Sequence, residues 1–416
     1  MVRSLAPTQP NVQRKAAPME TRAGDPGAFA HFDLSRVDSP AFVVDVQALR
    51  RNLSTLADIR DRAGIKVLAA LKAFSMWQVA PVVGEYLDGV CTSGLWEAKL
   101  AAEHYQGEIA TYCAAYKAED LPEICALSDH VIFNSPFQIA RFQPVLDAAR
   151  AAGHAFDVGL RINPLHQEGE VPRYDPCAPH SRLGFPVDQL RPEHLEGVSG
   201  LHFHTLCEQD FEPLRRTWGS LAPRIAPFLG RLKWLNFGGG HHVTRADYQR
   251  EDLIAFLRDV KAQTGCELYL EPGEAVALDA GILVGTVLDR HWNGMDIAIT
   301  DISATCHMPD VIEAPYRPAM LGELPIDEYE DGEGDKPVRL GGPSCLAGDV
   351  IGDYRLPVAA EPGARFAFLD QAHYSMVKTT TFNGVPLPSI WLWDSNTDTL
   401  DLIRTFAYED FRDRLS

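Results

Sequence analysis

VLAALKAFSMWQVAPVVGEYLDGVCTS, residues 67–93, is the stretch of the sequence that decides the fold. It opens with the apolar run VLAAL, continues through a segment whose apolar residues have helical spacing, and ends in a second apolar run, GVCTS. Short apolar runs separated by helical segments predict parallel strands that are buried on both faces. We therefore interpret this stretch as one strand–helix–strand unit.

The same unit repeats between about Val67 and Leu270. One of its predicted helices, SPFQIARFQPVLDAARAAG, begins with Ser135 as N-cap and Pro136 at the first helical position, and it ends at Gly153. Eight strands over roughly 200 residues favour a (β/α)8 barrel over an open doubly wound sheet. The predicted strands are residues 67–72, 89–93, 109–113, 130–134, 157–162, 199–204, 233–238 and 267–272.

The chain outside the barrel has a different texture. After about Gly281, alternating apolar residues with turn residues between them predict strands in ILVGTVLDR, MDIAITDIS, KPVRLGG and RFAFLDQ, and SPAFVVDV (39–46) has the same pattern. We therefore expect an α/β protein with a TIM-like (β/α)8 barrel and a C-terminal all-β domain that the N-terminal strand joins. The predicted divisions are a flexible extension (1–27), the N-terminal strand (28–46), the barrel (47–283) and the β-domain (284–416), with an exposed acidic loop at 322–337 and a long functional connection at 162–199.

Composition and charge narrow the class of protein. Hydrophobic residues make up 46% of the chain, yet no run approaches the ~20 apolar residues that a membrane span needs. The N-terminal residues lack an apolar signal region and the eight cysteines include no CxxC pair, which together favour a cytoplasmic location. A net charge of −19 disfavours nucleic acids and acidic membranes as partners. That charge is compatible with a polycationic substrate, although solubility alone also accounts for it.

Candidate site residues stand at the predicted strand ends, where barrels of this type build their active sites. Lys72 follows five apolar residues, where burial would make the charged amine costly and favour a nucleophilic, Schiff-base lysine. Arg161 and His204 end the fifth and sixth strands, and the triplet Gly238–Gly240 after the seventh predicts an anion cradle. Glu271 ends the eighth strand, where a carboxylate can pair with a protonated ring nitrogen. Each residue alone is compatible with a structural role, but together they indicate a pyridoxal phosphate site.

Seven motifs between about Ser39 and Asp394 carry a family resemblance. They are ALKAFS (70–75), HSRLGF (180–185), GLHFHTLCE (200–208), NFGGGHH (236–242), EPGEA (271–275), GGPSCLAGD (341–349) and YSMVKTTTFNG (374–384). In these motifs the chain resembles the alanine-racemase-like, fold type III pyridoxal phosphate decarboxylases, the group that includes ornithine and diaminopimelate decarboxylases. Within that group it resembles the branch that acts on carboxylated polyamines.

The resemblance implies roles for the residues at the strand ends. Lys72 would bind pyridoxal 5'-phosphate covalently, and His204 would stack on the cofactor ring. Glu271 would face the pyridine nitrogen, while Gly238–Gly240 and Tyr374 would hold the phosphate. The resemblance also implies a head-to-tail homodimer with its active sites at the interface.

The resemblance extends to the substrate side of the site. Cys345 from the opposite subunit would complete the site and reprotonate the substrate carbon. Ornithine and diaminopimelate relatives have an arginine after Glu-Pro-Gly and an acidic residue after the catalytic cysteine, whereas this chain has Glu274 and Leu346. Because a glutamate suits an ammonium group, we expect Glu274, with Asp310 and Asp349, to recognise substrate amines. The expected reaction is loss of CO2 from carboxyspermidine or carboxynorspermidine, which gives spermidine or norspermidine in polyamine biosynthesis.

Three alternatives remain open from the sequence. A metal-dependent barrel hydrolase would use His202, His204, His241 and His242 as ligands, because strand alternation places residues 202 and 204 on one face; Lys72 and the glycine triplet would then have no role. A non-catalytic pyridoxal phosphate carrier would have the barrel, but such proteins usually lack the β-domain. An ornithine-, lysine- or diaminopimelate-type decarboxylase is the nearest alternative, and Glu274 argues against it.

Overall fold

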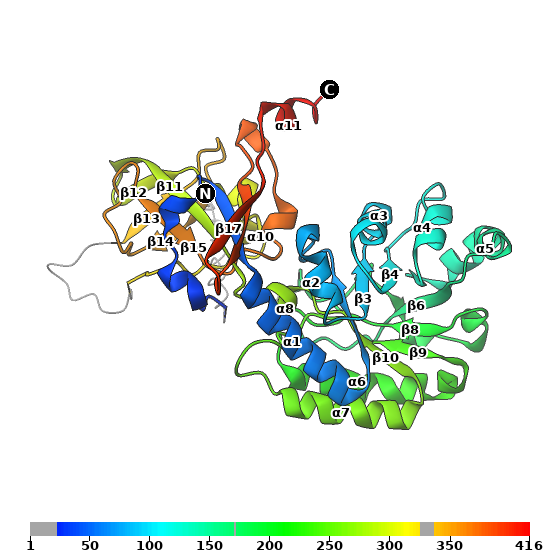
Figure 1. Ribbon diagram of the computed structural model, residues 1–416. Helices are drawn as coiled ribbons and strands as arrows, with labels where there is room; N and C mark the ends of the chain where they lie inside the picture. Colours follow the sequence, from blue (N-terminus) through cyan, green and yellow to red (C-terminus); the bar gives the residue numbers. More distant parts are fainter. Residues whose placement is uncertain (1–22, 170–171, 325–336) are drawn as a thin grey trace, which may run out of the picture.

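The computed structural model describes residues 23–169, 172–324 and 337–416. Most of the predicted extension (1–27) and of the predicted acidic loop (322–337) therefore lies outside the described residues. The described chain forms a barrel and a sheet domain that lie side by side, and α1 (Val46–Ala63) leads from the first strand of the sheet domain into the barrel (Figure 1). Among the described helices, none is long and apolar enough to cross a membrane.

Eight parallel strands close the barrel, as the sequence predicts. Each strand pairs with the next, and the last pairs with the first, so the sheet has no open edge between them. The strands in spatial order are β2 (Lys66–Ala70), β3 (Gly89–Thr92), β4 (Glu108–Tyr112), β5 (His130–Phe133), β6 (Asp157–Asn163), β8 (Gly200–His202), β9 (Trp234–Asn236) and β10 (Glu267–Leu270).

Helices cover the outside of the barrel. The helix predicted from Ser135 is α5 (Pro136–Ala151), and the Ser135 side chain accepts a hydrogen bond from the Gln138 N–H as an N-cap. Gly64 ends α1 in a left-handed conformation that favours glycine. The other barrel helices are α2 (Ala80–Gly84), α3 (Leu95–His104), α4 (Leu121–Leu127), α6 (Phe211–Ile225), α7 (Arg250–Thr264) and the short α8 (Glu274–Ala277).

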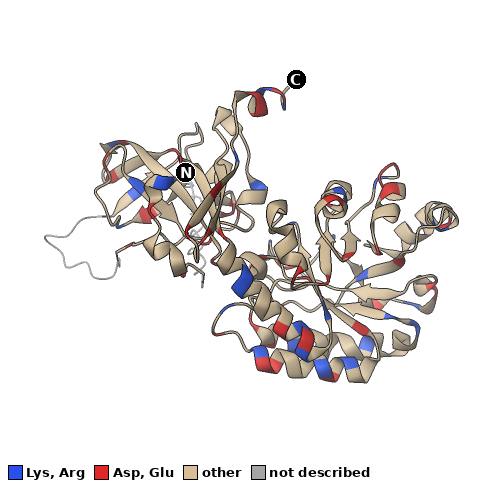
Figure 2. Cartoon of the chain, in the orientation of Figure 1, with Lys and Arg blue, Asp and Glu red and all other residues tan. Residues whose placement is uncertain are grey.

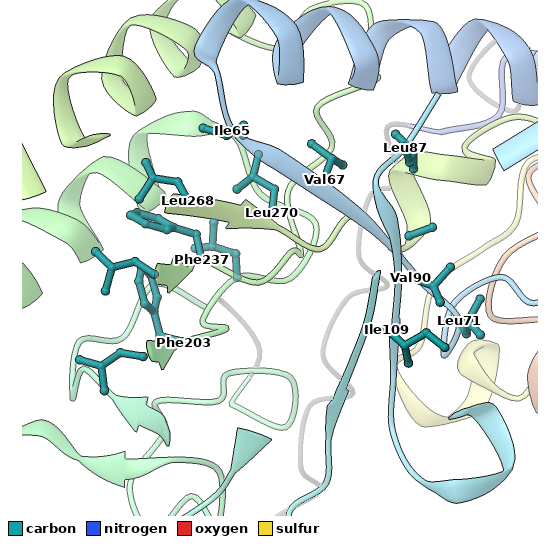
Figure 3. Close-up of a cluster of buried hydrophobic side chains, with 14 of the residues drawn as sticks. Ile65, Val67, Leu71, Leu87, Val90, Ile109, Phe203, Phe237, Leu268 and Leu270 are labelled. Carbon is teal, nitrogen blue, oxygen red and sulfur yellow. The ribbon is translucent and has the colours of Figure 1, made fainter. Parts of the chain in front are cut away.

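Strand residues alternate between two apolar environments. Val67 of β2 belongs to the core between strands and helices, together with Leu268 and Leu270 of β10 (Figure 3). Leu68 instead points into the barrel, where it packs with Trp234 and other interior residues. Burial on both faces explains why the strands are near-continuous apolar runs in the sequence.

The connection between β6 and β8 is not a simple helix, in agreement with the sequence. It contains the two-residue strand β7 (Phe185–Pro186), which pairs with β6, and two short 3-10 helices, Val187–Gln189 and Pro192–Leu195.

The outer helices carry interspersed acidic and basic side chains (Figure 2). Arg62 of α1, for example, pairs with Asp58 of the same helix and with Glu251 of α7.

The sheet domain combines the N-terminal strand with the C-terminal third of the chain, as predicted. Its sheet is mixed, since β1 pairs parallel to β16 and β12 pairs parallel to β13, and short helices lie in its connections. The spatial order is β14 (Val350–Tyr354), β13 (Val338–Gly341), β12 (Asp296–Thr300), β11 (Gly281–Trp292), β1 (Ala41–Asp45), β16 (Ser389–Asp394) and β17 (Thr399–Arg404), and β15 (Arg365–Phe368) pairs with β11. The short helices are α9 (Ala304–His307), α10 (Asp310–Glu313), α11 (Tyr408–Arg412) and the 3-10 helices Met376–Lys378 and Phe382–Gly384.

The two parts of the chain meet where α8 leads into β11. Asp279 has a left-handed φ of 52°, and its N–H donates to Asp370 Oδ1 over 2.7 Å. Its carboxylate accepts hydrogen bonds from the N–H groups of Gly24 (2.6 Å) and Asp25 (3.1 Å). Asp279 thus connects the N-terminal segment to both the barrel and the sheet domain.

Removal of the Asp279 charge should stabilise the protein at high pH. Burial and the nearby Asp370 carboxylate raise the pKa of Asp279 to about 7. A raised pKa contributes stability that is complete below the unfolded value and is lost as the pH rises through about 7. Asparagine keeps the acceptor oxygen and tolerates the left-handed conformation. We expect Asp279→Asn to raise the thermal midpoint by about 2 °C or more at pH 8 and by less at pH 5. Asp401→Asn, at an exposed position, is the control; an equal loss at both pH values would contradict this account.

Candidate active site

A cavity of about 980 Å³ lies at the carboxyl ends of the barrel strands, where the sheet domain covers the rim. Five of the predicted site residues line it: Lys72, His204, Gly240, Glu271 and Tyr374. Glu274 and Asp310, which the sequence assigns to the substrate, line it as well. The structure thus brings these seven predicted residues of one chain into a single cavity.

Lys72 occupies the predicted place but not the predicted environment. It lies two residues after the end of β2, and its side chain is exposed rather than buried in this single chain. The expectation that the barrel buries the lysine is therefore wrong for the isolated chain. The apolar run ends at Leu71, one residue after β2, and Lys72 projects from the rim into the cavity.

Glu271 follows β10 and is held by two neighbours. Its Oε2 accepts a hydrogen bond from His202 Nε2 (3.1 Å), and its Oε1 accepts one from Asn236 Nδ2 (2.7 Å). Burial raises the pKa of the Glu271 carboxyl, but the contacts with His202 and Asn236 bring it below its usual value. Burial lowers the pKa of His202, so its imidazole is neutral. The cavity therefore contains a buried carboxylate that stays ionised at neutral pH.

Arg161 supports this arrangement from outside the cavity. Its guanidinium carbon lies 4.5 Å from the centre of the Tyr112 ring, which in turn stacks on His202 at 5.5 Å. Arg161 also donates a hydrogen bond to the backbone oxygen of His204 (3.1 Å). Arg161 therefore holds two histidine segments in place and does not itself line the cavity.

The glycine turn after β9 is tightly packed. A side chain on Gly239 would meet the Glu271 carbonyl oxygen at 2.1 Å, and one on Gly240 would meet the Leu206 carbonyl oxygen at 1.9 Å. The Gly238 N–H donates to Asn236 Oδ1 (2.8 Å) and the Gly239 N–H to His204 Nδ1 (3.0 Å). Of the triplet only Gly240 lines the cavity, so the first two glycines shape the turn.

His204 presents a neutral ring to the cavity. Its Nδ1 accepts the Gly239 N–H, which fixes the orientation of the imidazole. Burial, together with the charges of Lys72 and Arg161, holds the pKa of His204 well below its usual value. A neutral, flat ring next to Lys72 is suited to stack on an aromatic cofactor.

Tyr374 comes from the sheet domain, on the segment between β15 and the 3-10 helix at Met376–Lys378. Its φ of 44° is left-handed, and its N–H donates to the carbonyl oxygen of Ala73 over 2.7 Å. This bond attaches the sheet domain to the residue next to Lys72. Burial raises the pKa of the Tyr374 hydroxyl, so it remains a protonated donor.

Glu274 lies among histidines that the sequence did not assign to it. Its Oε2 is 3.0 Å from His242 Nε2, and its Oε1 is 3.7 Å from His373 Nε2. His373 Nε2 also lies 3.0 Å from Asp370 Oδ2. The signals for these residues were their places beside recognised motifs: His242 ends NFGGGHH, and His373 directly precedes Tyr374.

The remaining candidates differ in position. Asp310 pairs with Lys378 Nζ at 2.5 Å at the edge of the cavity. Asp349 is buried away from the cavity, and its carboxylate accepts hydrogen bonds from Ser303 Oγ (2.8 Å) and the Ser344 N–H (3.2 Å). The Asp349 side chain therefore shapes the loop that carries Cys345. Cys345 itself is exposed and does not line the cavity of its own chain.

The four histidines of the hydrolase alternative make separate contacts. His202 bonds to Glu271 and His204 to Gly239, while His242 Nε2 lies 3.0 Å from Glu274 Oε2. His241 Nδ1 bonds to the Tyr248 hydroxyl at 2.7 Å. The strand β8 ends at His202, so strict alternation does not extend to His204. The arrangement gives no support to a shared metal site for these four side chains.

The chain matches known proteins over most of its length. Residues 41–372 match the family model described as pyridoxal-dependent decarboxylase, C-terminal sheet domain. The chain is 39% identical to a carboxynorspermidine/carboxyspermidine decarboxylase of Campylobacter jejuni, over 90% of this chain and 98% of that protein. It is also 39% identical to a carboxyaminopropylagmatine decarboxylase of Synechocystis, over 92% of this chain and 96% of that protein. The crystal structure of carboxynorspermidine decarboxylase from Campylobacter jejuni, complexed with norspermidine, superposes with a TM-score of 0.81 and covers 91% of this chain and 100% of that one.

A substitution in the glycine turn tests the geometry of the cavity. Gly240 has a φ of 88° and leaves no room for a side chain, so we expect Gly240→Ala to destabilise the protein by about 1–3 kcal/mol and to weaken retention of pyridoxal phosphate. Gly219→Ala is the matched control, because Gly219 is exposed in α6 with open space around it; this change should stabilise by about 0.5–1 kcal/mol. Thermal unfolding and cofactor absorbance after desalting measure both effects. Wild-type behaviour of Gly240→Ala would contradict the described turn.

Proposed function

The chain belongs to the pyridoxal-dependent decarboxylase family, and from this premise we propose that it removes CO2 from carboxyspermidine or carboxynorspermidine. The products would be spermidine or norspermidine. The observation that carries the proposal is Glu274, a carboxylate held between two histidines in the same cavity as Lys72. This is a site for a cationic group on a substrate that reacts next to Lys72.

The cavity residues fit pyridoxal phosphate. When bound, that cofactor supplies an electron sink for the electron pair left behind as the α-carboxylate departs. Lys72 would bind it covalently, the ionised Glu271 would hold a proton on its ring nitrogen, and the neutral His204 ring would stack on it. Gly240 and Tyr374 would contact its phosphate, with Gly238, Gly239 and Arg161 holding these groups in place.

The substrate side of the cavity suits a chain with several amines. Glu274 offers an ionised carboxylate, because burial raises its pKa but the charges of His242 and His373 lower it to about 2. Asp310 adds a second acid, already paired with Lys378. We assign Asp349 to the support of the Cys345 loop rather than to an amine contact, because its oxygens are occupied inside the protein.

A guanidinium-ended substrate is the second candidate. The observation that favours it is the carboxyaminopropylagmatine decarboxylase of Synechocystis, which is as similar to this chain as the Campylobacter jejuni enzyme. A carboxylate accepts either an ammonium or a guanidinium. Ornithine, lysine and diaminopimelate are disfavoured, because they offer Glu274 either a short chain or a second carboxylate.

Amine products identify the substrate. We expect purified enzyme with pyridoxal phosphate to release amines from carboxylated polyamines and not from ornithine, lysine or diaminopimelate, as measured by chromatography. Inclusion of carboxyaminopropylagmatine in the same assay separates the two candidate substrates.

Lys72→Ala should abolish turnover. Glu274→Gln should raise KM for the preferred substrate about 10- to 100-fold, since a hydrogen bond to a charged group contributes about 1.5–3 kcal/mol. Glu119→Gln, at an exposed position, is the control. Turnover of diaminopimelate in place of polyamines would overturn the assignment.

We further propose that the active unit is a homodimer in the cytoplasm in which Cys345 reaches the cavity of the partner subunit. Two features support this: Cys345 is exposed, and it lies away from its own cavity. Mixing inactive Lys72→Ala and Cys345→Ala chains should restore about a quarter of wild-type activity, because random exchange makes half of the dimers mixed and each mixed dimer has one intact site. Absence of recovery after demonstrated subunit exchange would exclude the shared site. Cys266→Ala, at a buried cysteine outside the cavity, is the control.

A further inference from the structure

The amine-binding carboxylate is held from two sides. Glu274 is 15% exposed, and each of its oxygens faces a different imidazole: His242 at 3.0 Å and His373 at 3.7 Å. The two histidine side chains are only 5% and 10% exposed. Glu274 is therefore confined between two rings, and only a limited part of its carboxylate reaches the cavity.

His373 is itself fixed by its own segment of the sheet domain. Its Nε2 lies 3.0 Å from Asp370 Oδ2, three residues earlier in the chain. Within this segment Ser375 Oγ donates to Gln371 Oε1 over 2.7 Å, and the Asp370 backbone is left-handed with a φ of 56°. The His373 ring also meets Tyr374 edge-on at 5.9 Å. His373 therefore lies between Asp370 of the sheet domain and Glu274 of the barrel, and we call these three residues the Asp–His–Glu series.

Charge explains what this series does. Burial lowers the pKa of His373, but Asp370 and Glu274 raise it to about 10, so the imidazole is cationic at neutral pH. The burial of Glu274 alone would favour its protonated, neutral form, and the charges of His242 and His373 together outweigh that burial. A neutral carboxyl group would lose its charge-assisted bond to a substrate amine.

His242 is a second cationic neighbour of Glu274, on the barrel side of the carboxylate. Glu208 lines the same cavity, and burial and the Glu274 carboxylate raise its pKa to about 7. Burial lowers the pKa of His242, but Glu274 raises it above its usual value. Lys378 is already paired with Asp310 and Glu313. The phenols of Tyr316 and Tyr374 stay protonated, because burial raises the pKa of both.

We propose that His373, held by Asp370, is a specificity-determining positioning residue that keeps Glu274 charged and oriented toward the substrate amine. The inference rests on the proposed function and deepens it. It assigns the preference for a cationic substrate to three residues from two domains, Asp370, His373 and Glu274, rather than to Glu274 alone.

The test compares His373→Gln with wild type on the preferred carboxylated polyamine. We expect KM to rise at least about tenfold at pH 6.5, with kcat changed less than about threefold, because a charge-assisted bond is lost in binding. The ratio of variant to wild-type KM should fall as the pH rises toward 8.5, because a Glu274 with a raised pKa regains its charge there. Asp370→Asn should show the same trend more weakly, and His154→Gln, at an exposed position, should show none.

A double-mutant cycle separates positioning from a general structural role. In a Glu274→Gln background, His373→Gln should add little to KM, because the group that it positions is gone. The proposal would be overturned if the effects of the two substitutions on KM were additive. It would also be overturned if His373→Gln lowered kcat and raised KM by the same factor at every pH. Binding of norspermidine and spermidine, followed through the cofactor absorbance, distinguishes a failure of the proposed function from a failure of this inference alone. Wild type that neither binds nor converts any polyamine overturns the proposed function as well, whereas active wild type with an unaffected His373→Gln variant overturns only this inference.

Discussion

The pairing of β10 with β2 closes the barrel, and the whole site depends on it. Tyr269 and Leu270 lie opposite Lys66 and Val67, and the pairing continues past the strands through the Ala70 N–H bond to the Pro272 carbonyl (2.9 Å). Because the two strands are parallel, their next residues emerge at one rim. Lys72 and Glu271 come from opposite ends of the barrel sequence and become neighbours only through this closure. An open sheet with the same strands would place them at different edges.

The histidines along this rim have different roles, because burial and the charged groups around them give them different protonation states. Burial lowers the pKa of His202 and His204 and keeps both imidazoles neutral, although the Glu271 carboxylate raises the pKa of His202 in part. His373 is equally buried but lies between two carboxylates, and it is cationic. The neutral histidines thus serve as a donor and a flat surface, while the cationic one stabilises an anion. Burial lowers the pKa of all three histidines, and at His373 the two neighbouring carboxylates outweigh it.

Sequence reasoning succeeded where the physics is local and failed where contacts join distant segments. The eight strands were predictable because burial on both faces makes each an apolar run, and Lys72, His204 and Glu271 followed from their places at strand ends. The partners of Glu274 were not predictable, since His242 and His373 belong to different domains and carry no periodic signal. The exposure of Lys72 and the internal bonds of Asp349 depend on side-chain directions that the sequence pattern does not contain.

Lys72 and Cys345 are both exposed in the single chain. Lys72 opens into a cavity that its own chain leaves accessible, and Cys345 projects from a loop that Asp349 braces from inside. Cys345 does not line the cavity that contains Lys72 of its own chain, whereas in the homodimer that we propose each loop would face the cavity of the partner subunit. The proposed homodimer would account for both the exposed Cys345 and the open Lys72 rim, because each would be covered by the other chain.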